Sequence, residues 1–205
     1  GNLQYNIANK IWRFADNQSD YIGAIKYLPT KRDGWIDMFC WNTGNNPTSS
    51  KAYYDQNFID WGINNIGNEA SNTYYTLSVE SWEYLLRERE VTHAGYYSDV
   101  VINDVNGVST GLMLLRDDWR CPSGITFGNK LTFTTAQWAE LEATGAVFLR
   151  SGSYWTSSNY HPYAPVDGAN YFNTNYLNFH GWGLYENYAD TPEEKCAVRL
   201  VKKVQ

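Results

Sequence analysis

The pattern of hydrophobic and polar positions predicts a helix that begins at Ser78. A serine hydroxyl is a favoured N-cap, and an acidic residue such as Glu80 is stabilised in the positive first turn. Val79, Trp82 and Leu86 recur at helical spacing, so they form one apolar face. We therefore expect this helix to pack against the core through these three side chains.

A second helix is predicted to begin at Thr134, because Thr134 and Gln137 have the spacing of a capping box. Trp138 and Leu141 form its apolar stripe, and Gly145 is a suitable residue to end it.

The rest of the pattern predicts short strands. Apolar and polar residues alternate over Leu3–Ile7, as in a half-buried strand. Further strands are expected at Ala146–Leu149 and Thr174–Phe179. The nearly continuous apolar run Ala197–Val201 is typical of a central strand that is covered on both faces. Two helices with many strands and much irregular loop indicate an α+β fold, in a single domain over residues 1–205.

A β-hairpin is predicted where Val100–Val105 and Val108–Leu115 flank the pair Asn106-Gly107, which suits a type I′ turn. The same region contains a G-x-S-x-G pattern around Ser109. A nucleophile elbow needs a strand before the serine and a helix after it. Here the serine leads into a strand, so we do not expect a catalytic serine.

Charge and hydrophobicity exclude several classes of protein. Hydrophobic residues make up 43% of the chain, which excludes intrinsic disorder. No apolar run is long enough to span a membrane. The net charge is -6, and no Lys or Arg occurs from residue 151 to 194. Nucleic-acid surfaces interleave aromatic residues with cations, so we expect no nucleic-acid partner.

No residue cluster predicts a metal, a cofactor or an enzymatic reaction. The histidines His93, His161 and His180 lack zinc-site spacing. Asp117-Asp118 is interpreted as a turn before Trp119. The three cysteines are too scattered for a disulfide framework and are interpreted as small buried hydrophobic residues: Cys40, Cys121 and Cys196.

The segment 153–188 is the strongest functional signal, with 11 aromatic residues and six asparagines. Tyr and Asn suit a contact surface, because they combine rigid amphipathic area with adaptable hydrogen bonds. Strand alternation places Leu177 and Phe179 inward and Tyr176, Asn178 and His180 outward. The ligand-binding segment therefore covers about residues 153–190. The candidate ligand-binding residues are Asn159, Tyr160, His161, Tyr163, Asn175, Tyr176, Asn178, His180, Trp182, Tyr185 and Asn187.

The core is predicted from the same patterns. Seven residues on the inward faces are expected to be buried: Trp82, Trp138, Trp155, Leu177, Phe179, Val198 and Leu200.

A series of short motifs resembles one family of bacterial surface domains in its order along the chain. The motifs lie at residues 2–5, 12–14, 76–82, 105–108, 117–119, 145–149, 154–158 and 198–201. With them the chain resembles the Fibrobacter succinogenes major paralogous domain of Bacteroidales and, more broadly, the C-type-lectin-like fold. The resemblance implies two helices, small antiparallel sheets, paired N- and C-terminal strands, and a long irregular region that carries the ligand surface.

The chain is also similar to the variable proteins of diversity-generating retroelements, which include phage receptor-binding tips. Adenine-directed mutagenesis of Asn codons cannot produce Glu, Lys, Gln, Met or Trp. These types occupy two of the 32 residues in 159–190, against 34 of 205 in the chain. This resemblance implies a non-enzymatic receptor-binding module for a protein or glycan, on a bacterial cell surface or a phage particle.

Two alternatives stay open. One is a glycan-binding adhesin domain of a gut bacterium with fixed specificity, and the other is an enzyme on the formylglycine-generating scaffold. The triplets with which C-type lectins coordinate calcium, such as Glu-Pro-Asn and Trp-Asn-Asp, do not occur, so a calcium-dependent sugar site is not expected.

Overall fold

The computed structural model describes residues 1–22, 34–53, 57–89, 96–104, 107–159, 169–173 and 195–202. Two short helices and several small mixed sheets make up this part of the chain, so the architecture is α+β. Within these ranges, no helix has the length and apolar character needed to cross a membrane. The helices are α1 (Val79–Glu83) and α2 (Thr135–Ala143), with a 3-10 turn η1 (Trp61–Ile63) and a π-helical turn η2 (Tyr84–Glu88).

The strands of the described residues form four sheets. The first has the order β2-β1-β3, with β1 (Leu3–Asn6), β2 (Ile11–Phe14) and β3 (Trp35–Ile36). The second has the order β11-β10-β12-β4, with β4 (Met38–Phe39), β10 (Ser153–Asn159), β11 (Ala169–Asn173) and β12 (Cys196–Ala197). The third pairs β5 (Tyr74–Thr76) with β13 (Leu200–Lys202). The fourth has the order β8-β6-β7-β9, with β6 (Tyr96–Asp104), β7 (Gly107–Leu114), β8 (Thr132–Thr134) and β9 (Val147–Arg150).

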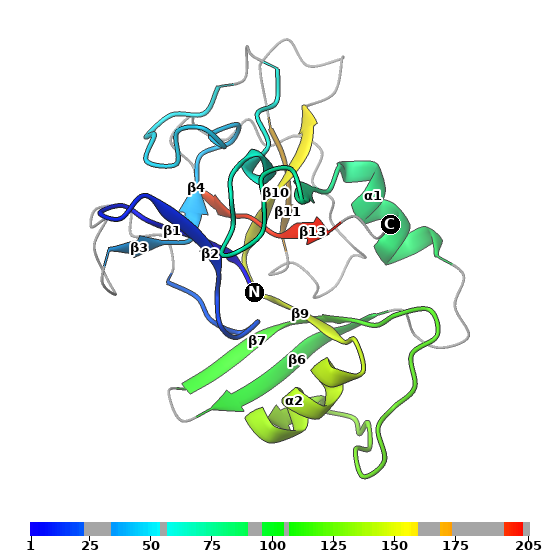
Figure 1. The fold of residues 1–205 in the computed structure, drawn as a ribbon. Helices are drawn as coiled ribbons and strands as arrows, with labels where there is room; N and C mark the ends of the chain where they lie inside the picture. Colours follow the sequence, from blue (N-terminus) through cyan, green and yellow to red (C-terminus); the bar gives the residue numbers. More distant parts are fainter. Residues whose placement is uncertain are drawn as a thin grey trace.

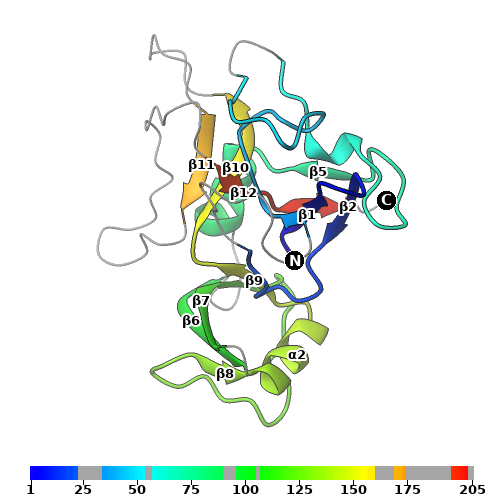
Figure 2. The ribbon, with the colours of Figure 1, turned by 90° about the vertical axis from the view of Figure 1, so that its left-hand side faces the viewer.

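These elements gather in two lobes. The fourth sheet and α2 form the lower lobe in Figure 1, while the other sheets and α1 form the upper lobe. Figure 2, turned by 90°, shows the same division, with β9 leading from the lower lobe toward β10 in the upper one. Each lobe has its own buried apolar cluster. A third cluster joins α1 and η2 to β7, β9, β10 and β12.

The predicted core is confirmed for its described members, which are at most 8% exposed: Trp82, Trp138, Trp155, Val198 and Leu200. The other two predicted core residues, Leu177 and Phe179, lie outside the described residues, as does the predicted strand Thr174–Phe179.

The start and the apolar face of the first predicted helix are confirmed. The Ser78 side chain accepts a hydrogen bond from the backbone N–H of Ser81 at the start of α1. Val79, Trp82 and Leu86 are all buried, as their spacing predicted. Leu86 lies in η2, where the helix continues with π-helical hydrogen bonding.

The second helix, α2, begins with the predicted capping box. The Thr134 hydroxyl accepts from the backbone N–H of Gln137, and the Gln137 side chain accepts from the backbone N–H of Thr134. Trp138 and Leu141 are buried. Gly145 follows the C-cap with a φ of 93°, a left-handed conformation that favours glycine.

Replacing Thr134 by alanine is expected to lower the free energy of unfolding by about 1 kcal/mol, because the cap loses its acceptor. Thr135→Ala is a matched control, since Thr135 is exposed and is not the capping residue of α2. It should change the free energy by less than about 0.5 kcal/mol. Urea denaturation of both variants measures the difference, and equal stabilities would contradict the capping role.

The predicted hairpin is confirmed as β6 and β7, but β6 begins at Tyr96 instead of Val100 and Gly107 is not part of the turn. Asp104 pairs with Gly107, so Gly107 belongs to β7 and is not a central residue of the turn. Ser109 lies inside β7, as expected for a serine outside a nucleophile elbow. Gly111 has a packing role, because a Cβ there would collide with the carbonyl oxygen of Leu149 in β9. The predicted strand Ala146–Leu149 corresponds to β9.

The N-terminal alternation gave a wrong prediction for the polar side chains of β1. Gln4 and Asn6 are buried, as Leu3 is. The Gln4 side chain accepts from Nε of Arg13 in β2 at 3.0 Å, and Asn6 accepts from the backbone N–H of Asn9 at 2.9 Å. Hydrogen bonds to neighbouring elements therefore let β1 bury polar groups on the face that was expected to meet solvent.

The prediction of a single central strand at Ala197–Val201 was wrong. This run is divided between β12 and β13, which belong to different sheets. Between them the Val198 carbonyl accepts a hydrogen bond from the backbone N–H of Leu3 at 3.0 Å. The N-terminal strand β1 does not pair with the C-terminal strand β13. Instead, β1 pairs with β2 and β3, and β13 pairs with β5. The terminal pairing implied by the resemblance is therefore limited, in the described residues, to this bond.

Candidate functional site

The structure describes one of the predicted ligand-binding residues. Asn159 is the last residue of β10 and pairs with Ala169 of β11. The other candidates lie outside the described residues: Tyr160, His161, Tyr163, Asn175, Tyr176, Asn178, His180, Trp182, Tyr185 and Asn187. The structure does show the sheet whose strands β10, β11 and β12 are connected in the sequence by the two stretches 160–168 and 174–194.

The centre of this sheet is β10, which is held from several directions. Tyr154, Trp155 and Thr156 are at most 1% exposed. The indole Nε1 of Trp155 donates to the Phe39 carbonyl at 2.6 Å, and the indole of Trp41 donates to the Thr156 carbonyl at 3.0 Å. Burial raises the pKa of the Tyr154 phenol to about 12, so this hydroxyl stays protonated at neutral pH. The strand is thus a fixed base for the residues that follow it.

The C-terminal end of β10 is tied to the start of α1. The backbone N–H of Ser157 donates to the Leu77 carbonyl at 3.0 Å. The Ser158 hydroxyl accepts from the backbone N–H of Val79 at 3.0 Å and lies 3.4 Å from a carboxylate oxygen of Glu80. Hydrogen bonds lower the pKa of the Glu80 carboxyl group, and the largest effect comes from the Ser78 hydroxyl. The serines of the motif at 154–158 therefore position the chain where the candidate residues begin.

The two stretches start from opposite ends of β10. The first leaves β10 after Asn159 and returns at Ala169, its pairing partner. The second leaves β11 after Asn173, which pairs with Ser153, and it returns to β12 beside Tyr154, the partner of Ala197. A strand rises about 3.3 Å per residue, so these two ends are roughly 20 Å apart. That all candidates share one face stays a prediction, and it requires one stretch to extend along the sheet.

Sequence reasoning missed the residues that form this base. Trp41, Leu77 and Phe39 lie far from the candidate segment in the sequence, yet each bonds to β10. The sequence feature that indicates this base is the motif at 154–158, in which three small hydroxyl residues follow two large aromatic residues.

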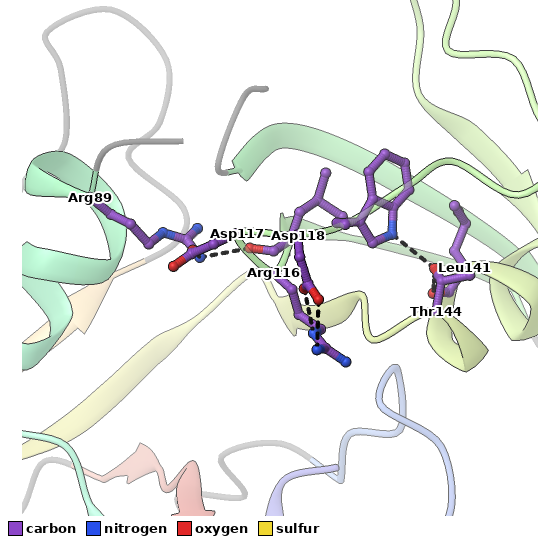
Figure 3. Close-up of polar contacts among 8 residues, drawn as sticks. Arg89, Arg116, Asp117, Asp118, Leu141 and Thr144 are labelled. Atoms are coloured by element: carbon purple, nitrogen blue, oxygen red, sulfur yellow. Dashed lines mark hydrogen bonds and ion pairs between the residues drawn. The ribbon is translucent and has the colours of Figure 1, made fainter. Parts of the chain in front are cut away.

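The Asp117-Asp118 pair forms a turn, as interpreted from the sequence, and both carboxylates are in ion pairs (Figure 3). Arg89 contacts Asp117 at 2.8 Å, and Arg116 contacts Asp118 at 3.0 Å. Arg89 also donates to the Leu115 carbonyl at 2.7 Å, so it connects the end of η2 to the end of β7. The Arg89 contacts are therefore a structural cross-link, whereas the Arg116–Asp118 pair is local and exposed.

The prediction for the cysteines was wrong at one position. Cys40 and Cys196 are buried, but Cys121 is exposed. Cys121 lies in the long loop between β7 and β8, where its thiol contacts the Ile125 carbonyl at 3.3 Å. Among the described residues, no group of three or more His, Cys, Asp or Glu side chains could hold a metal ion. The three histidines lie outside the described residues.

Comparison of the chain with protein-family models, with curated proteins and with solved structures found no match.

Proposed function

We propose that the chain is a non-enzymatic binding module with a C-type-lectin-like fold, which recognises a protein or glycan receptor through residues 159–188. The observation that carries the proposal is the arrangement around β10. The Tyr-containing stretch 160–168 and the stretch 174–194, which contains both Tyr and Asn, begin and end on a sheet that is fixed by indole, hydroxyl and backbone hydrogen bonds. Binding residues commonly lie on connections that a fixed scaffold positions.

The composition of the two stretches supports recognition by contact area. They contain no Lys or Arg, so charge attraction to an anionic partner contributes little. Tyr and Trp side chains supply large surfaces with few rotatable bonds, and Asn side chains both donate and accept hydrogen bonds. This chemistry fits a protein surface or a glycan with many hydroxyl groups.

The low content of Glu, Lys, Gln, Met and Trp in residues 159–190 supports a diversified receptor-binding protein of a phage or of a bacterial surface. A near-identical copy of the codons for this segment beside the gene, together with a reverse transcriptase gene, is the expected genomic result. A segment with no such repeat, identical across strains, would favour an adhesin domain of fixed specificity.

Alanine substitution of Tyr176 and Trp182 tests the proposed surface. A glycan array and a panel of purified bacterial surface proteins would first supply a bound ligand. If either residue is a hot spot, its substitution should weaken that binding by about 2 kcal/mol, roughly 30-fold. The free energy of unfolding should change by about 0.5 kcal/mol or less. Tyr84→Ala is the matched control, because Tyr84 is 52% exposed and lies outside the segment.

The result that contradicts the proposal is loss of folding in these variants with unchanged affinity in the folded fraction. Because the two stretches start at opposite ends of β10, Tyr160→Ala should be measured in parallel. Loss of affinity in both sets indicates one continuous face, and loss in one set assigns the ligand to one end of β10.

A further inference from the structure

The lower lobe has a hollow that has no part in the surface described above. It lies between β6, β8 and the loop that leads into β8, and its volume is about 680 Å³. Small-molecule sites usually have volumes of about 300–1,000 Å³. Every residue that lines it lies within the described ranges and outside the proposed binding residues 159–188, so the hollow is independent of the proposed function.

One wall of the hollow is aromatic, and it packs against further aromatic side chains of the lobe. The rings of Tyr97 and Phe127 meet edge to face, with centroids 5.0 Å apart and planes at 87°. Phe127 also packs against Trp119, with ring centroids 5.6 Å apart. It packs against Phe133, a buried residue of β8, with ring centroids 5.8 Å apart. The wall is therefore connected to the core of the lobe.

The hollow also has an aliphatic portion, lined by Val101 and Leu131. The backbone N–H of Val101 donates to the Leu131 carbonyl at 2.8 Å, which holds the loop against β6. Parallel pairing of Val101 with Thr132 continues this attachment into β8. The apolar lining is thus formed by backbone segments that are hydrogen-bonded to each other.

The exposed polar side chains that line the hollow are those of Asn129, Lys130 and Thr132. Within the described part of the chain, these three side chains form no hydrogen bond or ion pair. They offer one positive charge, one amide and one hydroxyl next to an apolar wall. A few polar groups that converge on an apolar surface are the usual composition of a small-molecule site.

We propose that this hollow binds a six-membered ring that carries one carboxylate group. The ring would lie against Tyr97 and Phe127, where the aromatic surface is removed from water on binding. The Lys130 ammonium would pair with the carboxylate, and the amide of Asn129 and the hydroxyl of Thr132 would bond to the remaining polar atoms. Such a ring can belong to an acidic sugar or to an aromatic acid.

The test is a titration of the protein followed by amide chemical shifts, with four probes. Methyl glucuronoside and benzoate carry the carboxylate, and methyl glucoside and benzyl alcohol are their neutral counterparts. We expect the amides of residues 127–132 to shift with at least one anion at millimolar concentration and to shift much less with its neutral counterpart. A response to the glucuronoside alone identifies an acidic sugar, and a response to benzoate alone identifies an aromatic acid.

Two lysine variants assign the charge. Lys130→Gln should weaken binding of the anion by about two- to five-fold, which is the range of an exposed ion pair. Lys51→Gln is the control, because Lys51 is also exposed but lies outside the hollow. Thermal unfolding should be the same for both variants. Equal binding of the neutral probes, an equal loss in Lys51→Gln, or no shift in residues 127–132 with any probe would overturn the proposal.

Discussion

Replacing Trp155 by alanine is expected to lower the free energy of unfolding by about 4–5 kcal/mol, which is a large part of the stability of an ordinary domain. The side chain is 1% exposed and belongs to the apolar cluster of the upper lobe, so its removal leaves a large cavity. The Phe39 carbonyl would also lose the indole donor that lies 2.6 Å away. Chemical denaturation measured by fluorescence or circular dichroism checks the value.

Trp155→Phe separates the two contributions to this loss. Phenylalanine retains much of the ring area but has no N–H group, so the Phe39 carbonyl loses the indole donor while most of the packing is kept. We expect an intermediate loss of about 2 kcal/mol for this variant. If Trp155→Ala unfolds at the same denaturant concentration as the unmodified chain, the central position of β10 in the upper core is wrong.

The second large effect is expected at Gln18, whose side-chain amide joins the two lobes. Its Oε1 accepts from the backbone N–H of Phe148 at 2.8 Å and from the Arg199 guanidinium at 2.6 Å. Its Nε2 donates to a carboxylate oxygen of Glu142 at 2.6 Å and to the Ala146 carbonyl at 3.3 Å. The amide therefore pairs with the outer edge of β9 as the backbone of another strand would.

Gln18→Ala is expected to cost about 3 kcal/mol of unfolding free energy. Arg199 is 9% exposed, so little solvent compensates its charge, and this burial lowers the pKa of its guanidinium. Without Gln18, this buried cation loses an acceptor, and the backbone groups of Phe148 and Ala146 lose their bonds to the amide. Urea denaturation measures the loss.

A double-mutant cycle makes this prediction specific. Gln18→Glu keeps an acceptor for Arg199 but places a carboxylate next to Glu142, so it should be destabilising by itself. Adding Glu142→Gln restores a donor opposite the new carboxylate and should recover part of the loss. The proposed role of Gln18 is excluded if Gln18→Ala changes the free energy by less than about 0.5 kcal/mol, or if the two substitutions are additive.

The sequence predicted the elements whose stabilising contacts are close along the chain. Ser78 and Thr134 were identified as helix caps, because each bonds to a backbone N–H three residues later. The hairpin of β6 and β7 was recognised from its two apolar runs, although β6 begins at Tyr96 instead of Val100 and Gly107 belongs to β7. The candidate segment was recognised from composition, but the ends of β10 to which its stretches connect depend on strand pairing.

The sequence by itself therefore determined the two helices, the β6–β7 hairpin and some of the large buried side chains, such as Trp82 and Trp138, because local spacing and capping specify them. Only the tertiary structure decided that Gln4, Gln18 and Arg199 are buried, that Cys121 is exposed, and that the apolar run near the C-terminus is divided between two sheets. The physical reason is the distance along the chain between partners. Gln18 and Arg199, for example, are 181 residues apart in sequence and bond at 2.6 Å. A hydrophobic pattern that covers one or two helical turns cannot contain such a contact. The burial of a polar group, however, depends on contacts of this kind.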